Sequence, residues 1–153
     1  MSKPIIFYSA TDIANFEICK CHIINKIRER LRGTQLKKIN PSRTVLEYQK
    51  QGEYIEASFL AALQDHNVIQ IEGGNLKERI KKTNEAILKK KEYIYQACLC
   101  SKNLIGYPDL LVKANDESYE VMDIKRSKEP KKSHVTQIHT YNYLLSSINN
   151  FPI

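Results

Sequence analysis

The last third of the chain carries three short segments in a fixed order: Gly106-Tyr107-Pro108-Asp109, then Tyr119-Glu120-Val121-Met122-Asp123-Ile124-Lys125, then Gln137-Ile138-His139-Thr140-Tyr141. In the first, an acid closes a turn that a glycine and a proline introduce. In the second, another acid stands two residues before a lysine at the end of an apolar run. In the third, a glutamine and a tyrosine are four residues apart, one turn of a helix. This order predicts two neighbouring strands and a helix that together carry a metal-dependent site for cutting a phosphodiester.

The composition fits a single globular domain over residues 1–153. Hydrophobic residues make up 42% of the chain and nine residues are tyrosines, whereas disordered chains contain few of either. Lysines and arginines number 24 against 17 acids, which gives a net charge of +7. That balance favours a polyanionic partner, nucleic acid first. A lysine-rich solvated surface explains the charge equally well, so charge alone does not decide the function.

The sequence predicts a cytoplasmic protein with no membrane association. No apolar run approaches the roughly 20 residues that a membrane-spanning helix needs. The first residues, Met1 to Ile6, lack the apolar region and the small-residue cleavage site of a signal peptide. Four cysteines in a chain of this length are too few for a secreted disulfide scaffold, so we expect reduced thiols.

The residues before position 93 predict three helices and one strand. Ser9 and Asp12 offer capping side chains to a helix that runs to about Leu31 and stops near Gly33. The other predicted elements are a basic linker over residues 35–43, a helix over 44–64, a strand over 67–72 and a helix over 76–91.

Three strand-like runs follow in close succession and predict an antiparallel meander. They cover residues 93–100, 106–113 and 118–125, with turn residues between them. Apolar residues then recur at helical spacing over residues 134–146, which predicts a closing helix. The order of elements predicts an α/β fold in which a small mixed or antiparallel central sheet is flanked by helices.

Asp109, Asp123 and Lys125 form the candidate site. Mg²⁺ prefers hard oxygen ligands and keeps several waters, so a few carboxylates together with substrate phosphate suffice to bind it. Asp123 and Lys125 are two residues apart, so on a strand they project from the same face while Ile124 points to the core. The ammonium group is then placed to hold an attacking water and to neutralise charge on the phosphate. The alternative is that Asp109 is a turn residue and that Asp123 and Lys125 form a surface ion pair.

The order Gly-x-Pro-Asp, Asp-x-Lys, Gln-x-x-x-Tyr resembles that of the PD-(D/E)XK nucleases, and specifically of the RecB-like nuclease family. Upstream, Gly52-Glu53-Tyr54-Ile55-Glu56 looks like the glycine-initiated helical motif of that family. Residues 83–97 look like the run that leads into its first core strand. The resemblance covers most of the chain from about residue 10. It implies a restriction-endonuclease-like core and a DNA substrate, single- or double-stranded.

The same resemblance implies a role for each matching residue. It implies one or two Mg²⁺ or Mn²⁺ ions, held by three carboxylates and one backbone carbonyl. It assigns Lys125 to orienting the nucleophilic water, and Gln137 and Tyr141 to lining the site beside Lys125 or the nucleic-acid backbone. The implied metal ligands are Glu56, Asp109, Asp123 and the backbone carbonyl of Ile124.

Two departures from the family pattern leave other interpretations open. Ile55 stands where the most similar subgroup carries a histidine ligand, and the chain ends before the last strand of the family core. That end suggests a fragment of a longer protein, with a helicase or another nuclease subunit as a candidate partner, because related domains sit beside such modules. The main alternative to a deoxyribonuclease is a nucleic-acid-binding module that keeps the fold without turnover. A further alternative is an interaction or toxin–immunity domain in which this pattern of acids is incidental.

The cysteines do not match a metal site. They occur as Cys19-Lys20-Cys21 and Cys98-Leu99-Cys100. Some RecB-like nucleases hold an iron–sulfur cluster with one early cysteine and three after the last helix, whereas no cysteine follows Cys100 in this chain. The Cys-x-Cys spacing also differs from the Cys-x-x-Cys pairs of zinc sites. We therefore expect neither an iron–sulfur cluster nor a zinc site.

Overall fold

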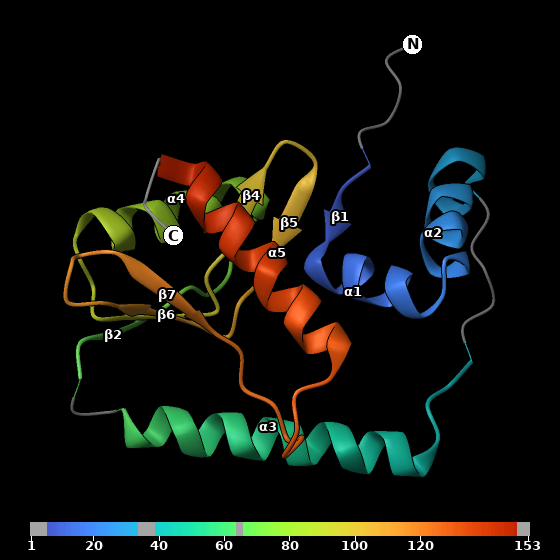
Figure 1. Ribbon diagram of the computed structural model, residues 1–153, viewed down its shortest axis with the longest axis horizontal. Helices are drawn as coiled ribbons and strands as arrows, with labels where there is room; N and C mark the ends of the chain where they lie inside the picture. Colours follow the sequence, from blue (N-terminus) through green and yellow to red (C-terminus); the bar gives the residue numbers. More distant parts are fainter. Residues whose placement is uncertain (1–5, 34–38, 64–65, 150–153) are drawn as a thin grey trace.

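A computed structural model describes residues 6–33, 39–63 and 66–149 of the chain. The fold is mixed α/β, with two small mixed sheets flanked by helices (Figure 1). The helices are α1 (Ala10–Ile18), α2 (Cys21–Arg32), α3 (Arg43–Ala62), α4 (Leu76–Leu88) and α5 (Lys132–Asn149). The strands are β1 (Tyr8–Ser9), β2 (Val68–Gln70), β3 (Tyr93–Tyr95), β4 (Leu99–Ser101), β5 (Leu104–Gly106), β6 (Leu110–Lys113) and β7 (Tyr119–Met122).

Two sheets stand where the sequence predicted one. Their strand orders are β1-β5-β4 and β2-β3-β6-β7. The pairs β1–β5 and β2–β3 are parallel, and the other neighbours are antiparallel. The antiparallel pairing of β3 with β6 and of β6 with β7 confirms the predicted meander. The predicted strand over residues 93–100, however, is divided between the sheets, and Gly106 ends β5 rather than beginning β6.

A bend shared by two neighbouring segments causes this division. Gln96, directly after β3, has a φ of +55°, in the left-handed region that residues other than glycine rarely adopt. Pro108 and Asp109 lie in the corresponding gap between β5 and β6. The Gln96 N–H donates to the Asp109 carbonyl oxygen at 2.9 Å, so one hydrogen bond holds the two gaps together. Asp109 is thereby fixed at the junction of the two sheets.

Helix α5 closes the core over this junction. It packs against α1, β4, β5 and β7, and its Tyr141 and Leu144 are buried in the main apolar cluster. Gly106 lies directly beneath it: a Cβ at that position would stand 2.7 Å from Tyr141 Cδ1 and 2.8 Å from Leu144 Cδ1. Only glycine leaves room for so close an approach of helix to strand.

The predicted first helix is two helices. α1 ends at Ile18, the backbone of Cys19 is extended, and α2 begins at Cys21. The prediction of a continuous helix to about Leu31 is therefore wrong, because α2 turns back and packs against α1. The predicted stop at Gly33 is confirmed, since this residue caps α2 with a φ of +64°.

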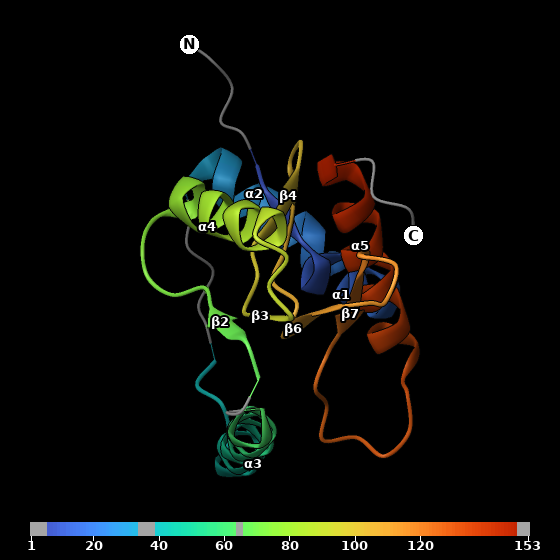
Figure 2. The ribbon, with the colours of Figure 1, turned by 90° about the vertical axis from the view of Figure 1, so that its left-hand side faces the viewer.

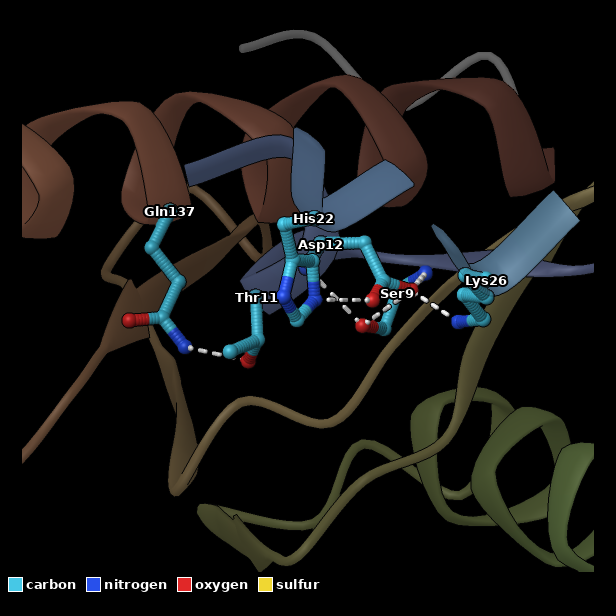
Figure 3. Close-up of polar contacts among 6 residues, drawn as sticks. All are labelled: Ser9, Thr11, Asp12, His22, Lys26 and Gln137. Atoms are coloured by element: carbon cyan, nitrogen blue, oxygen red, sulfur yellow. Dashed lines mark hydrogen bonds and ion pairs between the residues drawn. The ribbon is translucent and has the colours of Figure 1, made fainter. Parts of the chain in front are cut away.

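Asp12 joins these two helices (Figure 3). Its Oδ2 accepts the Ser9 N–H at 2.7 Å, and its own N–H donates to Ser9 Oγ at 3.0 Å. The expected capping side chains thus form a capping box at the start of α1. From α2, His22 Nε2 lies 3.1 Å from Asp12 Oδ1, and Lys26 forms an ion pair with the same carboxylate. These polar contacts from two helices satisfy a buried acid.

Helix α3 lies apart from the sheets along one side of the molecule (Figures 1 and 2). None of its twenty residues, all of which are described, is buried. It is attached to the rest of the protein by polar contacts, through Glu56 near the sheets and through Arg126 of the loop before α5. Specific polar contacts, with the half-buried Ile55, Phe59 and Leu60 on the same helix, thus set its position.

The remaining elements match the sequence predictions within a few residues. β2, α4 and α5 occur where they were expected, but α4 ends at Leu88, before the predicted end near residue 91. β7 ends at Met122, so Asp123 and Lys125 follow the strand instead of lying on it. Part of the predicted linker, residues 35–38, and the chain end, residues 150–153, lie outside the described residues. Among the helices of the described part of the chain, none combines the length and the apolar character that crossing a membrane requires.

Gly106→Ala is expected to lower the free energy of unfolding by about 1–3 kcal/mol, the usual cost of overpacking, because the added methyl group overlaps the Tyr141 ring and the Leu144 side chain. Urea unfolding followed by circular dichroism measures the change. Gly52→Ala is the matched control, since a Cβ at that helical position meets nothing within 4 Å and alanine favours helix. Equal losses in both variants would contradict the close approach of α5.

Asp12→Asn is expected to destabilise the protein in a pH-dependent way. Burial raises the pKa of Asp12, but hydrogen bonds from Lys26, Ser9 and His22 outweigh it and hold this pKa at about 2, below its ordinary 3.8. The charged carboxylate therefore stabilises the fold above about pH 4, and this contribution is lost as the pH falls from about 4 to about 2.

Thermal unfolding of wild type and Asp12→Asn, from about pH 6 down to about pH 2.5, checks this expectation. At the upper end the free energy of unfolding of the variant should be lower by about 1.5–3 kcal/mol, the usual contribution of hydrogen bonds to a charged group. The gap should then close toward the lower end. Glu120→Gln, at an exposed position, is the control. A gap between wild type and Asp12→Asn that stays constant with pH would show that the charge of Asp12 is not what stabilises the fold.

Candidate metal and catalytic site

Asp109 and Asp123 face each other at the end of the β6–β7 pairing. The register pairs Leu110 with Met122, so the next residues outward, Asp109 and Asp123, lie opposite one another. Asp109 Oδ2 also accepts the Ile124 N–H at 2.6 Å, which holds the segment after β7 against the junction of the sheets. The predicted neighbourhood of the two aspartates is present in the structure.

Asp123 and Lys125 form a partly buried ion pair. Lys125 Nζ lies 2.7 Å from Asp123 Oδ2, while the Asp123 side chain is only 4% exposed. The contact lacks hydrogen-bond geometry, so Asp123 Oδ2 is a buried oxygen without a hydrogen-bond donor among the described residues. The predicted proximity of acid and lysine is confirmed, but the pair is not the surface ion pair of the alternative interpretation.

The positive charge near Asp109 and Asp123 does not balance the negative charge of their two carboxylates. Burial raises the pKa of Asp109, and the neighbouring Asp123 carboxylate raises it further, to about 7. The Ile124 N–H and Lys125 act in the opposite direction and do not compensate. Facing carboxylates in a buried position are typical of functional sites, where a cation or a proton supplies the missing charge.

Glu56 reaches the sheets from α3 and is held there by two donors. Its Oε1 accepts from the Tyr95 hydroxyl at 2.6 Å and from Gln96 Nε2 at 3.0 Å. Burial and then the Glu56 carboxylate raise the pKa of Tyr95 to about 12, so this hydroxyl remains a donor at neutral pH. Glu56 is thereby placed next to the residue whose N–H binds the Asp109 carbonyl.

Gln96 connects these parts of the site. Its side chain binds Glu56, its N–H binds Asp109, and its carbonyl oxygen accepts from Arg79 Nη2 at 3.2 Å. A residue other than glycine persists in a left-handed conformation when surrounding contacts hold it there, and such residues concentrate at functional sites. The sequence analysis missed Tyr95 and Gln96. Gln96 could have been recognised from the sequence, because it carries the one side-chain amide within the apolar run over residues 93–100.

Gln137 and Tyr141 lie side by side on α5, as predicted. Gln137 Nε2 donates to the Tyr141 hydroxyl at 2.9 Å. It also donates to Thr11 Oγ1 of α1 at 3.4 Å (Figure 3). Burial raises the pKa of Tyr141, and the Asp123 charge raises it further. Tyr141 therefore stands near the carboxylates, whereas the described contacts of the Gln137 amide go to Tyr141 and Thr11. A role of Gln137 in positioning Lys125 stays a prediction.

Ile55 and Ile124 occupy half-buried positions next to candidate ligands. Ile55 offers no side-chain ligand on α3, beside Glu56. Ile124 is half-buried where the sequence predicted a core residue, and its N–H is bound to Asp109. The role of the Ile124 carbonyl as a metal ligand stays a prediction.

The residues present fit a divalent cation with hard oxygen ligands. Mg²⁺ is usually held by one or two carboxylates together with substrate phosphate and water, which Asp109 and Asp123 satisfy. Within the described residues no three side chains of histidine, cysteine, aspartate or glutamate are close enough to hold a metal. Glu56, held by Tyr95 and Gln96, is therefore not assembled with the two aspartates in this structure.

Asp123 and Lys125 open on a cavity of 430 Å³ between the loop after β7 and the start of α5, which we call the site cavity. His134 and His139 line it as well. A larger cavity of 680 Å³ lies between β7 and α5 and contains none of the candidate catalytic residues. The chemistry of its lining residues therefore makes the smaller cavity the candidate for the reaction.

Comparisons with known proteins add no family to these observations. No protein-family model matches the chain, and no curated protein or solved structure matches it. The candidate site consequently depends on its residues and their geometry, and the RecB-like resemblance stays a prediction from the sequence.

Asp109→Asn is expected to stabilise the metal-free protein by roughly 0.5–2 kcal/mol, the usual gain from a stabilising substitution that removes an unfavourable interaction at a functional site. The amide keeps an acceptor for the Ile124 N–H and removes one of two facing negative charges. Mg²⁺ at 100 times its dissociation constant should raise the free energy of unfolding of the wild type by about 2.7 kcal/mol. It should not raise that of the variant.

Thermal unfolding in EDTA and in Mg²⁺ measures both effects. Glu120→Gln, an exposed acid on β7, should leave the response to Mg²⁺ intact. If Asp109→Asn destabilised the protein in EDTA and kept the response to Mg²⁺, the two aspartates would not be metal ligands.

Proposed function

We propose that this protein is a metal-dependent deoxyribonuclease with a restriction-endonuclease-like core, similar to the RecB-like nucleases, that acts in the cytoplasm. The observation that carries the proposal is the position of Asp123, opposite Asp109 and 2.7 Å from the Lys125 ammonium, at a buried junction that opens on a cavity. The net charge of +7 supports a polyanionic substrate. A helicase or another nuclease subunit is the partner that fits such a role.

Asp109 and Asp123 are the metal ligands in this proposal. They would hold a Mg²⁺ or Mn²⁺ ion, which would supply positive charge to the scissile phosphate and lower the pKa of a water. The Ile124 N–H fixes the orientation of the Asp109 carboxylate, so the ligand does not reorganise during the reaction. Glu56 is the third candidate carboxylate, and it supports the site from α3 through Tyr95 and Gln96.

Lys125 acts on the water and on the phosphate. Its ammonium group is held beside Asp123 and lines the site cavity, where it donates a hydrogen bond to the attacking water. As the water oxygen bonds to phosphorus and the bond to the leaving oxygen breaks, the same group neutralises developing negative charge. Hydrolysis then proceeds by direct attack of water, without a covalent enzyme intermediate. The proton that the attacking water loses passes to solvent in the open site cavity, and a solvent proton is taken up by the leaving oxygen.

A nucleic-acid-binding module of the same fold without turnover is the second candidate function. Two observations favour it: Ile55 replaces a candidate ligand, and Glu56 is bound by Tyr95 and Gln96 apart from the aspartates. The buried, facing pair of Asp109 and Asp123 favours the nuclease, because a binding surface gains nothing from two mutually repelling buried acids.

Incubation of the purified chain with single- and double-stranded DNA, in Mg²⁺, Mn²⁺ or EDTA, separates the two functions. Metal-dependent cleavage is expected, and Asp123→Asn and Lys125→Met should each reduce its rate by about 10²-fold or more, as loss of a charge-stabilising group does. Lys77→Ala, an exposed lysine on α4, is the control. Cleavage that survives either site variant contradicts the assignment, and binding without cleavage in any metal selects the second function.

A further inference from the structure

Helix α3 and the loop after β7 line an open basic groove of 540 Å³ next to the site, which we call the α3 groove. Four of its lining residues come from α3 and two come from the loop. The loop reaches down to α3 in two views at right angles (Figures 1 and 2). The lining residues are Lys50, Gln51, Tyr54, Ile55, Arg126 and Lys128.

The groove is a built feature rather than a chance approach of two segments. Its α3 residues recur at the spacing of a single helix face, at positions 50, 51, 54 and 55. Arg126 fixes the loop to this face: its Nη1 donates to Gln51 Oε1 at 3.0 Å, and its guanidinium lies 4.2 Å from the centre of the Tyr48 ring. The width of the groove is therefore set by specific contacts.

The charge of the groove fits a phosphate backbone. Lys50, Arg126 and Lys128 line it, and none of its six lining residues is acidic. Cations in such a row attract a polyanion and release its counterions on binding. Arg126 is also positioned to present donors to phosphate from a stacked, pre-oriented guanidinium.

An exposed aromatic side chain in the groove is a feature typical of binding sites for single strands. The Tyr54 side chain is 75% exposed, although a large ring of this kind is usually at least half covered. An exposed ring beside cations is a platform on which an unpaired base stacks. Within a duplex the faces of the bases are already covered by their neighbours, so a duplex cannot use this platform.

The groove adjoins the candidate active site. Lys128 lines both the α3 groove and the site cavity, and the site cavity contains Asp123 and Lys125. Tyr54 also precedes Glu56 by two residues on the helix that Glu56 connects to the sheets. A strand lying in the groove thus has a short path to the carboxylates.

We propose that the α3 groove binds single-stranded DNA, with a base stacked on Tyr54 and phosphates at Lys50, Arg126 and Lys128, and leads the strand to the Asp109–Asp123–Lys125 site. The inference rests on the proposed nuclease function for the fate of the strand. Binding itself requires neither metal nor turnover, so the groove is testable in isolation from catalysis.

Fluorescence anisotropy of the full chain in EDTA, with a labelled thymidine oligonucleotide and with a blunt duplex of equal length, tests the groove. The single strand should bind more tightly than the duplex. Tyr54→Ala should weaken single-strand binding by roughly 5- to 150-fold, the usual effect of removing one stacking ring, and Tyr54→Phe should not. Tyr143→Ala, which removes an exposed tyrosine from α5, is the matched control.

The salt dependence of single-strand affinity separates the contribution of the cations in the groove from that of the Tyr54 ring. Lys50→Ala should lower the slope of log affinity against log salt by about 0.7, the contribution of one phosphate contact on a single strand. Tyr54→Ala should leave that slope unchanged, and Lys77→Ala on α4 should alter neither slope nor affinity. Circular dichroism melts confirm that each variant is folded.

Equal binding of duplex and single strand, or equal effects of Tyr54→Ala and Tyr143→Ala, would overturn the proposal. Failure of the groove proposal is distinguishable from failure of the nuclease proposal. Groove-dependent binding of single strands without cleavage in any metal supports the groove and removes the nuclease. Metal-dependent cleavage with single-strand binding that is indifferent to Tyr54 supports the nuclease and removes the groove.

Discussion

Asp109 and Asp123 face each other across the end of the β6–β7 pairing. Their carboxylates are largely buried and repel each other, and the candidate site depends on this arrangement. Separately, each would be a minor feature: a turn residue and half of an ion pair. Together they raise the pKa of Asp109, and the Lys125 ammonium, 2.7 Å from Asp123 Oδ2, offsets this rise only in part. A fold tolerates two carboxylates beside one ammonium group when a cation or a proton supplies the remaining charge, since uncompensated buried charge is otherwise costly.

The scaffold around this pair is organised to keep it in place. The Gln96 N–H holds the bend at Asp109, and Gly106 lets α5 approach so closely that Tyr141 stands near the carboxylates. The Gln137 amide connects α5 to α1. Helix α3, in contrast, has no buried residue among its described positions and is joined to the body by polar contacts. The junction of the sheets thus carries the candidate chemistry, while the outlying helix carries the proposed α3 groove.

The sequence predicted the local relations of the site better than its long-range ones. The two-residue spacing of Asp123 and Lys125 and the four-residue spacing of Gln137 and Tyr141 depend on local geometry, and both pairs are in contact. The break between α1 and α2 depends on partners of Asp12 in a later helix, and the division into two sheets depends on the bend at Gln96. Such tertiary contacts override local periodicity, which is why they escaped prediction. The same reason explains why the donors to Glu56 were missed.

In the proposed nuclease, Asp109 and Asp123 form one metal-binding unit. Electron paramagnetic resonance of Mn²⁺ titrated into the protein, without nucleic acid, tests it most directly because bound and free Mn²⁺ give different signals. Wild type should bind Mn²⁺, and the double variant Asp109→Asn/Asp123→Asn, which preserves the shapes of both side chains, should lose this binding. Equal Mn²⁺ binding by wild type and the double variant would contradict the account.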